Sequence, residues 1–233
     1  MSQSIDRKSV VLIHGWGGSA QSVWNANGWF DLLRNAGFDP VGIDLPGHGD
    51  ALRSHDPAQY ADLASEVIAQ LPDVQALLGI GYSLGCKILL EIEARQPGRF
   101  TALVLGGLGG NVFAPEALGI VVAQCLEEGI PEDSPPVAKM LARYGVAAGN
   151  DPLAIAACLR REPNPILTPE RLRAVECPVL LVSGDADTVA YPVGLLADSI
   201  TQSSVEILTG IDHLHLPENK DFMAAALRFL AAS

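Results

Sequence analysis

Residues 77–90 read Leu77-Leu78-Gly79-Ile80-Gly81-Tyr82-Ser83-Leu84-Gly85-Cys86-Lys87-Ile88-Leu89-Leu90. An apolar run typical of a strand enters this segment, and an apolar pattern typical of a helix leaves it. Between them, Gly81 to Gly85 fit G-x-S-x-G, a sharp strand-to-helix turn that exposes its serine. Glycines two positions before and after Ser83 leave room for the turn, because a Cβ there would meet the neighbouring element. The pattern predicts that Ser83 is a nucleophile.

Strand-like and helix-like segments alternate on both sides of this turn. Apolar runs predict strands over residues 9–13, 38–43, 76–82, 101–105, 179–183 and 204–208. Helical apolar spacing predicts helices over residues 28–35, 60–71, 84–96, 193–200 and 219–230. This alternation predicts an α/β fold with a mostly parallel central sheet flanked by helices.

The alternation stops between residue 111 and about residue 170. This segment holds half of the 16 prolines of the chain, and prolines at that density break up long elements. Short helical patterns remain over residues 120–128 and 137–144. We therefore expect a short helical insertion at about 111–170 within one domain that spans residues 1–233.

Composition limits the class of protein and its partners. The chain has 233 residues, of which 48% are hydrophobic and 18% charged, as in a compact globular protein. Its net charge of −12 disfavours nucleic acid and anionic membranes as partners. No signal peptide or apolar run of transmembrane length is evident, so we expect a cytoplasmic protein. No disulfide framework or metal site is expected, because the four cysteines are far apart and form no C-x-x-C pair.

A serine nucleophile needs a base, and a histidine oriented by a carboxylate suits that role near neutral pH. The carboxyl ends of parallel strands meet at one edge of a sheet, so candidates should follow predicted strands. The candidate bases and acids are His14, His48, His55, His213, His215, Asp185 and Asp187. Of the five histidines, His55 lies in a polar segment, whereas the others follow strands.

The sequence resembles the α/β-hydrolase fold family over essentially its whole length. Five segments carry the resemblance: His14-Gly15-Trp16-Gly17-Gly18, Asp44-Leu45-Pro46-Gly47-His48-Gly49, Gly81-Tyr82-Ser83-Leu84-Gly85, Gly184-Asp185-Ala186-Asp187 and Gly210-Ile211-Asp212-His213. In that family the chain order is nucleophile, acid, histidine. The resemblance therefore implies that Ser83, Asp187 and His213 are the catalytic residues.

Two of these assignments have competitors. The family's acid stands three positions after the glycine that closes the penultimate strand, which fits Asp187 after Gly184, whereas Asp185 suits a turn. The spacing between Gly210 and the histidine likewise resembles the family pattern for His213. His215 remains the alternative base, and Asp185 the alternative acid.

Acyl transfer also needs N–H donors for the oxyanion. The residue after the nucleophile, Leu84, supplies one backbone N–H, and the resemblance implies that Trp16 supplies the second. We interpret His14 and His48 as structural residues of their loops, and Tyr82 as a packing residue beside the turn.

The resemblance implies a carboxylesterase-like serine hydrolase that needs no cofactor and no metal. It would cleave a small-molecule ester or thioester through an acyl-enzyme on Ser83, with the helical insertion as a cap over the pocket. Thioesterases, lactonases and C–C bond hydrolases with the same three residues are alternatives. A non-catalytic small-molecule receptor of the same fold is a further one. The sequence sets no oligomeric state.

Overall fold

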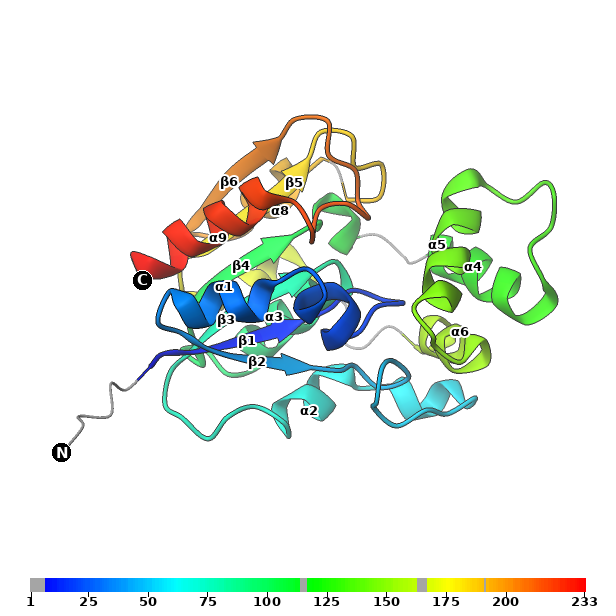
Figure 1. The fold of residues 1–233 in the computed structure, drawn as a ribbon, viewed down its shortest axis with the longest axis horizontal. Coiled ribbons are helices and arrows are strands. Elements are labelled where there is room, and N and C mark those ends of the chain that lie inside the picture. The colour runs from blue at the N-terminus through cyan, green and yellow to red at the C-terminus, as the bar shows by residue number, and fades with distance from the viewer. Residues whose placement is uncertain (1–6, 114–116, 163–166, 191) are drawn as a thin grey trace.

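The computed structural model describes residues 7–113, 117–162, 167–190 and 192–233 (Figure 1). Six strands within these residues form one sheet in the order β2-β1-β3-β4-β5-β6, and every neighbouring pair is parallel. The strands are β1 (Ser9–Ile13), β2 (Asp39–Ile43), β3 (Leu77–Tyr82), β4 (Phe100–Gly106), β5 (Val179–Gly184) and β6 (Ser203–Leu208). The prediction of an α/β fold with a parallel sheet is confirmed.

Helices cover both faces of this sheet (Figure 1). One face packs against α1 (Trp29–Asn35) and α9 (Lys220–Ala231). The other face packs against α2 (Leu63–Ile68), α3 (Leu84–Arg95), α7 (Pro169–Leu172) and α8 (Gly194–Ala197). Three short turns complete the layers, a π-helical turn η1 (Ala20–Asn25) and the 3-10 turns η2 (Pro57–Tyr60) and η3 (Gly110–Phe113).

The strands are apolar without interruption because both faces of the sheet are covered. In β1, Val10 and Leu12 contribute to the cluster under α1 and α9, whereas Val11 and Ile13 contribute to the cluster under α2 and α3. All four side chains are fully buried. Burial of one such side chain contributes roughly 1.5–3 kcal/mol to the free energy of unfolding. The helices on both faces therefore stabilise the strand, and with it the position of the strand end.

A group of three helices interrupts the alternation between β4 and β5. These helices are α4 (Ala117–Glu128), α5 (Pro136–Ala147) and α6 (Pro152–Arg160). They lie beyond the carboxyl ends of the strands, at the right of Figure 1, and share a small core that includes Val122, Ala138 and Ala142. The predicted helical insertion is therefore present, although its residues 114–116 and 163–166 lie outside the described residues.

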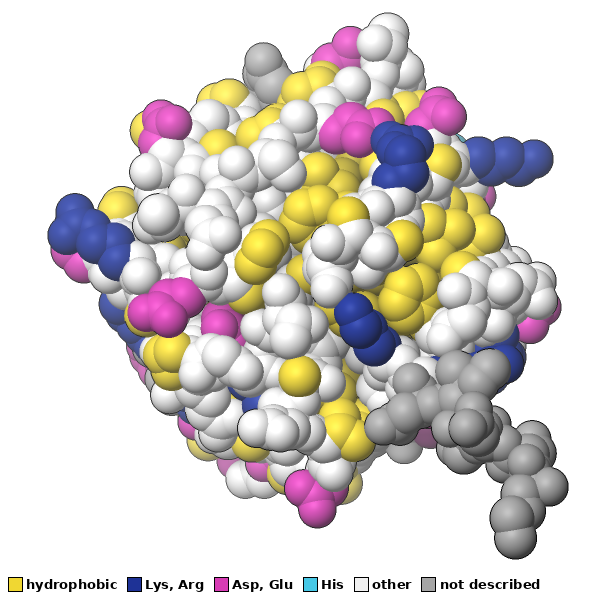
Figure 2. Space-filling view, turned by 90° about the vertical axis from the view of Figure 1, so that its left-hand side faces the viewer, with side chains coloured by type: hydrophobic (Ala, Val, Ile, Leu, Met, Phe, Trp, Pro, Cys, Tyr) yellow, Lys and Arg dark blue, Asp and Glu magenta, His cyan; other side chains and the backbone are white. Residues whose placement is uncertain are grey.

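On the end of the molecule opposite the insertion, the described residues present charged side chains of both signs. Figure 2 shows that face, on which apolar side chains reach the surface in bands and charged side chains are scattered.

Across the described segments, no helix combines the length and the apolar character that a bilayer crossing needs. In parallel α/β sheets ligands bind at the carboxyl ends of strands, which here face the insertion.

Candidate active site

Ser83 occupies the corner between β3 and α3. Its φ of 50° and ψ of −113° are strained for a residue with a Cβ, and no other non-glycine residue of the described segments has a positive φ. A Cβ added at Gly85 would lie 2.0 Å from the carbonyl oxygen of Ile13, and one at Gly81 would lie 2.8 Å from the amide nitrogen of Cys86. Close packing therefore requires both glycines that flank the serine.

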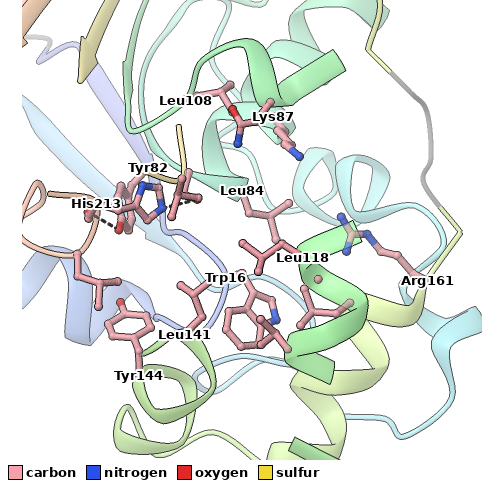
Figure 3. Close-up of a pocket in the computed structure, with 17 residues that line it drawn as sticks. Trp16, Tyr82, Leu84, Lys87, Leu108, Leu118, Leu141, Tyr144, Arg161 and His213 are labelled. Atoms are coloured by element: carbon pink, nitrogen blue, oxygen red, sulfur yellow. Dashed lines mark hydrogen bonds between the residues drawn. The ribbon is translucent and has the colours of Figure 1, made fainter. Parts of the chain in front are cut away.

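His213 follows β6 and brings its imidazole to this corner (Figure 3). Its Nδ1 lies 2.8 Å from Oδ2 of Asp187, and its Nε2 lies 3.1 Å from Oγ of Ser83. An ionised carboxylate only accepts hydrogen bonds, so Nδ1 carries the proton and Nε2 accepts from the hydroxyl. In this tautomer Nε2 is the atom that can remove the proton of Ser83.

Asp187 lies in the loop after β5 with 1% of its surface exposed. Its Oδ1 accepts the backbone N–H groups of Val189 at 2.8 Å and Ala190 at 2.9 Å. Burial opposes ionisation of this carboxyl, but the hydrogen bonds from His213 and from the two N–H groups outweigh burial and lower its pKa. Asp187 is therefore an ionised and firmly held partner of the imidazole.

The two competing residues lie elsewhere. Asp185 is exposed, and its Oδ1 accepts the N–H of Gly210 at 2.6 Å within the turn region after β6. The side chain of His215 is 65% exposed, and its Nδ1 lies 2.7 Å from Oδ1 of Asp212. The structure thus brings Asp187 and His213 to Ser83, and not their alternatives.

The loop after β1 approaches the serine closely. A Cβ added at Gly15 would lie 2.8 Å from the ring of Tyr82 and 3.1 Å from Cβ of Ser83. The next residue, Trp16, lines the same cavity as Ser83. Leu84 is the first residue of α3, where backbone N–H groups have no acceptor within the helix and the helix dipole is positive. The N–H group of Leu84 therefore lies directly after Ser83 at the positive end of this helix.

Two buried histidines form hydrogen bonds within and between the loops of the site. In His14, Nδ1 donates to the carbonyl of Gly15 at 2.7 Å, and Nε2 accepts the N–H of Leu45 at 3.0 Å. Nδ1 of His48 donates to the carbonyl of Pro46 at 3.0 Å. Burial lowers the pKa of His14, while burial and then the neighbouring His14 lower the pKa of His48 to about 3. Both imidazoles are neutral, and their hydrogen bonds fix two loops of the site.

The insertion is fastened to the same loop. The side chain of Asn150, between α5 and α6, donates to the carbonyl of Gly17 at 2.7 Å and accepts the N–H of Gly49 at 3.2 Å. The indole Nε1 of Trp16 donates to the carbonyl of Ile155 in α6 at 3.1 Å. The loop and the helices α5 and α6 are therefore joined by hydrogen bonds at the site.

Tyr82 contributes more than the packing role expected from the sequence. Its hydroxyl donates to the backbone carbonyl of His213 at 2.7 Å, and the centres of the two rings lie 5.2 Å apart. Tyr82 thus holds the residue whose imidazole faces Ser83. No sequence signal marks this contact, because it joins residues 131 positions apart.

A cavity of about 200 Å³ opens beside Ser83 and His213 (Figure 3). Its apolar wall is formed by Trp16, Leu84, Leu108, Leu118, Val122, Leu141, Leu159, Val189 and Leu214. Tyr144 also lines it, and burial raises the pKa of this phenol to about 12, so its hydroxyl stays protonated. Lys87 and Arg161 complete the charged part of the lining, and the sequence analysis identified neither.

Cys86 lies in the first turn of α3, three residues after Ser83. Burial raises the pKa of its thiol, so Cys86 is not a nucleophile at neutral pH. In the part of the chain that the structure describes, no three His, Cys, Asp or Glu side chains gather as metal ligands would.

Comparison with known proteins gives the family and its distant relatives. A family model described as "Alpha/beta hydrolase family" matches residues 10–226. The pimeloyl-[acyl-carrier protein] methyl ester esterase of Neisseria meningitidis serogroup B is 36% identical over 113 residues, covering 47% of this chain and 40% of that protein. The monoacylglycerol lipase of Mycolicibacterium smegmatis is 28% identical over 247 residues, covering 92% of this chain and 84% of the lipase.

Solved structures agree on the fold. An esterase from Exiguobacterium antarcticum superposes with a TM-score of 0.77 at 18% identity, over 96% of this chain and 92% of the esterase. The family model covers most of the chain, including the strand-to-helix turn at Ser83 and the helical insertion. The chain belongs to the alpha/beta hydrolase family.

Proposed function

We propose that this chain is a carboxylesterase-like serine hydrolase that cleaves a carboxylic ester of a small molecule through an acyl-enzyme on Ser83. The observation that carries the proposal is the continuous hydrogen-bond chain from Ser83 through His213 to Asp187 at the mouth of an apolar cavity. A nucleophile, a base and a carboxylate in this arrangement are the groups that acyl transfer requires.

In the proposed acylation, the three side chains act together. Nε2 of His213 takes the proton as Oγ of Ser83 attacks the ester carbonyl, and Asp187 stabilises the imidazolium that forms. Negative charge develops on the former carbonyl oxygen, where the N–H groups of Trp16 and Leu84 are the proposed donors. Collapse of the tetrahedral intermediate expels the alkoxide, which His213 protonates.

Deacylation uses the same groups in reverse. A water molecule loses its proton to Nε2 of His213, attacks the acyl-enzyme and releases the carboxylic acid with Ser83 restored. Each step needs only side chains and N–H groups of this chain, so the proposed reaction requires neither a metal nor an organic cofactor.

An ester is the bond best supported by the relatives. The names of two relatives, a methyl ester esterase and a monoacylglycerol lipase, both describe ester cleavage. The cavity beside Ser83 is apolar over most of its wall, which suits the acyl chain of such a substrate. Thioesters, lactones and C–C bonds next to a carbonyl would use the same residues and are tested beside esters.

The test combines active-site labelling with turnover. We expect a fluorophosphonate probe to label the native chain at Ser83, and Ser83→Ala to abolish both labelling and hydrolysis of p-nitrophenyl butyrate. His213→Ala should lower kcat by about 10³-fold or more, because the serine loses its base. His215→Ala is the matched control, since its exposed imidazole lies outside the hydrogen-bond chain, and should retain most activity.

Two outcomes would contradict the proposal. Full activity in His213→Ala would show that another residue acts as the general base. A folded chain that is not labelled by the probe, and that binds a ligand without converting it, would be a receptor. A panel of esters and acyl-CoA thioesters of graded length then identifies the bond that is cleaved fastest.

A further inference from the structure

Tyr144 differs from the other tyrosines that the structure describes, because its hydroxyl has no hydrogen-bond partner among the described residues. The hydroxyl of Tyr60 donates to the carbonyl of Ser54 at 2.7 Å. That of Tyr82 donates to the carbonyl of His213 at 2.7 Å. The ring of Tyr144 is half-buried, and polar groups withdrawn from water are usually hydrogen-bonded. Its hydroxyl is therefore suited to bind an acceptor that enters the cavity.

The ring of Tyr144 lies against the loop after β1. A Cβ added at Gly17 would lie 3.1 Å from Cδ1 of this ring, and one added at Gly18 would lie 3.1 Å from its hydroxyl oxygen. Nδ2 of Asn150 donates to the carbonyl of Gly17 at 2.7 Å and to that of Gly145 at 3.0 Å. These hydrogen bonds join the loop to the helix residue next to Tyr144, so the phenol has a defined place at the cavity that it lines.

The hydroxyl of Tyr144 points from α5 to the side of the cavity where His213 lies (Figure 3). Burial raises the pKa of Tyr82, and the nearby Tyr144 raises it further. Tyr82 in turn donates to the backbone of His213. The phenol of Tyr144 and the imidazole of His213 therefore belong to one region of the site.

Ester cleavage places negative charge on two substrate oxygens. The former carbonyl oxygen has two proposed N–H donors, those of Trp16 and Leu84. The alkoxy oxygen receives the electron pair of the breaking C–O bond, and His213 alone serves it in the mechanism proposed above. This oxygen leaves on the side of His213, because Nε2 protonates it. Since the hydroxyl of Tyr144 points to that side, the alkoxy oxygen is the acceptor that it is best placed to reach.

We propose, building on the proposed ester hydrolysis, that Tyr144 is a further catalytic residue whose hydroxyl donates a hydrogen bond to the alkoxy oxygen as that oxygen leaves. When the tetrahedral intermediate collapses, the C–O bond breaks, its electron pair goes to the alkoxy oxygen, and Nε2 of His213 supplies the proton of the released alcohol. The phenol keeps its own proton, because burial raises its pKa to about 12. Its hydrogen bond strengthens as charge grows on the oxygen, so it lowers the barrier of acylation.

The test uses four butyrate esters whose alcohols are of rising acidity, namely methyl, trifluoroethyl, phenyl and p-nitrophenyl butyrate. All four form the same butyryl-enzyme, so differences in kcat/KM report the acylation step in which the alcohol leaves. A methoxide oxygen is strongly basic and needs a donor, whereas p-nitrophenolate spreads its charge over the ring and needs little help. We expect Tyr144→Phe to lower kcat/KM for methyl butyrate about 10- to 100-fold, as expected for loss of a hydrogen bond to a charged group. The loss should shrink along the series and be small for p-nitrophenyl butyrate.

Tyr60→Phe is the matched control, because it removes a phenol hydroxyl that bonds to Ser54 and lies outside the cavity lining. Its kcat/KM should depend on the alcohol as that of the wild type does. Thermal unfolding checks that both variants are folded. A fluorophosphonate releases fluoride and not an alkoxide, so Tyr144→Phe should be labelled at close to the wild-type rate, which would show that Ser83 and His213 remain active.

The possible results separate this role of Tyr144 from the proposed function. An equal loss for all four esters would place the hydroxyl at the former carbonyl oxygen, and no loss for any ester would leave it as part of the cavity wall. Either result would overturn the role at the alkoxy oxygen and leave ester hydrolysis at Ser83 standing. A wild type that hydrolyses none of the four esters and is not labelled at Ser83 would refute the proposed function, and the role of Tyr144 with it.

Discussion

Replacing His48 with glutamine should make the protein less sensitive to acid between pH 7 and pH 5. The imidazole of His48 is fully buried, and burial, followed by the neighbouring His14, lowers its pKa from 6.5 to about 3. In the unfolded chain the same side chain takes up a proton near its ordinary pKa. Below pH 6.5 the unfolded state therefore binds more protons than the folded state, and stability falls as the pH falls toward 3.

The size of the effect follows from this difference in pKa. With an unfolded pKa of about 6.5 and a folded pKa far below the assay range, His48 removes about 1.9 kcal/mol of stability between pH 7 and pH 5. The pKa of His14 is lowered as well, but His14 is present in both proteins and its contribution cancels in the comparison. The free energy of unfolding of His48→Gln should therefore fall by about 1.9 kcal/mol less than that of the wild type.

Urea unfolding at pH 7, 6 and 5, followed by tryptophan fluorescence, measures the difference. His215→Gln is a control of opposite sign, because Asp212 raises the pKa of His215. That pair stabilises the fold below pH 6.5 and loses its effect as the pH rises through the folded pKa, and its exposure makes the effect small. Equal acid sensitivity in the wild type and in His48→Gln would show that the imidazole is protonated or hydrated in the folded state, which would refute the reasoning.

Two other substitutions test the carboxylate and the turn. Asp187→Asn should lower kcat for p-nitrophenyl butyrate by about 10⁴-fold, because the imidazole of His213 loses the partner that fixes its tautomer. Asp185→Asn should change kcat little, and similar losses in both variants would contradict the assignment of Asp187 as the acid. Gly85→Ala places a Cβ 2.0 Å from the carbonyl oxygen of Ile13, a backbone atom with little freedom to move, and should destabilise the fold by about 3 kcal/mol or more. Gly194→Ala, where no atom lies within 4 Å of the added Cβ, is its control and should be neutral or slightly stabilising in thermal unfolding, so a comparable loss there would argue against the clash.

The sheet could be predicted from the sequence because its strands are buried on both faces. The uninterrupted apolar run at Ser9–Ile13 gives the bounds of β1 without error, and the other predicted strands differ from the structure by at most one residue at either end. Burial on two sides leaves little room for polar residues, so the run begins and ends with the strand.

The helices were predicted less well because their ends depend on capping. A helix expected over 60–71 is observed only as α2, from Leu63 to Ile68, since Asp62 has an extended φ and its side chain caps the N–H of Ser65. The helix α6 was not predicted at all, although Asp151 followed by Pro152 is a typical start signal. The spacing of apolar residues alone does not reveal where such capping residues begin or end a helix.

The site shows the same division between local and distant information. Ser83 could be found from five consecutive residues, because the strained turn needs its glycines locally. The roles of Asp187 and His213 came from a resemblance and stay predictions, although the structure brings both to the serine. Lys87 and Arg161 read in the sequence as ordinary surface charges, since only the folded insertion brings them to one cavity.

The hydrogen bonds that join the insertion to the loop after β1 should affect how the enzyme discriminates against large substrates. Asn150 donates to the carbonyl of Gly17, and the indole of Trp16 donates to α6, so outward movement of these helices would break hydrogen bonds to the loop after β1. A substrate too large for the cavity would push α6 away and drag the backbone of Trp16 with it. The proposed oxyanion donor would then be misaligned during the reaction, so we expect oversized esters to lose kcat, and not only affinity.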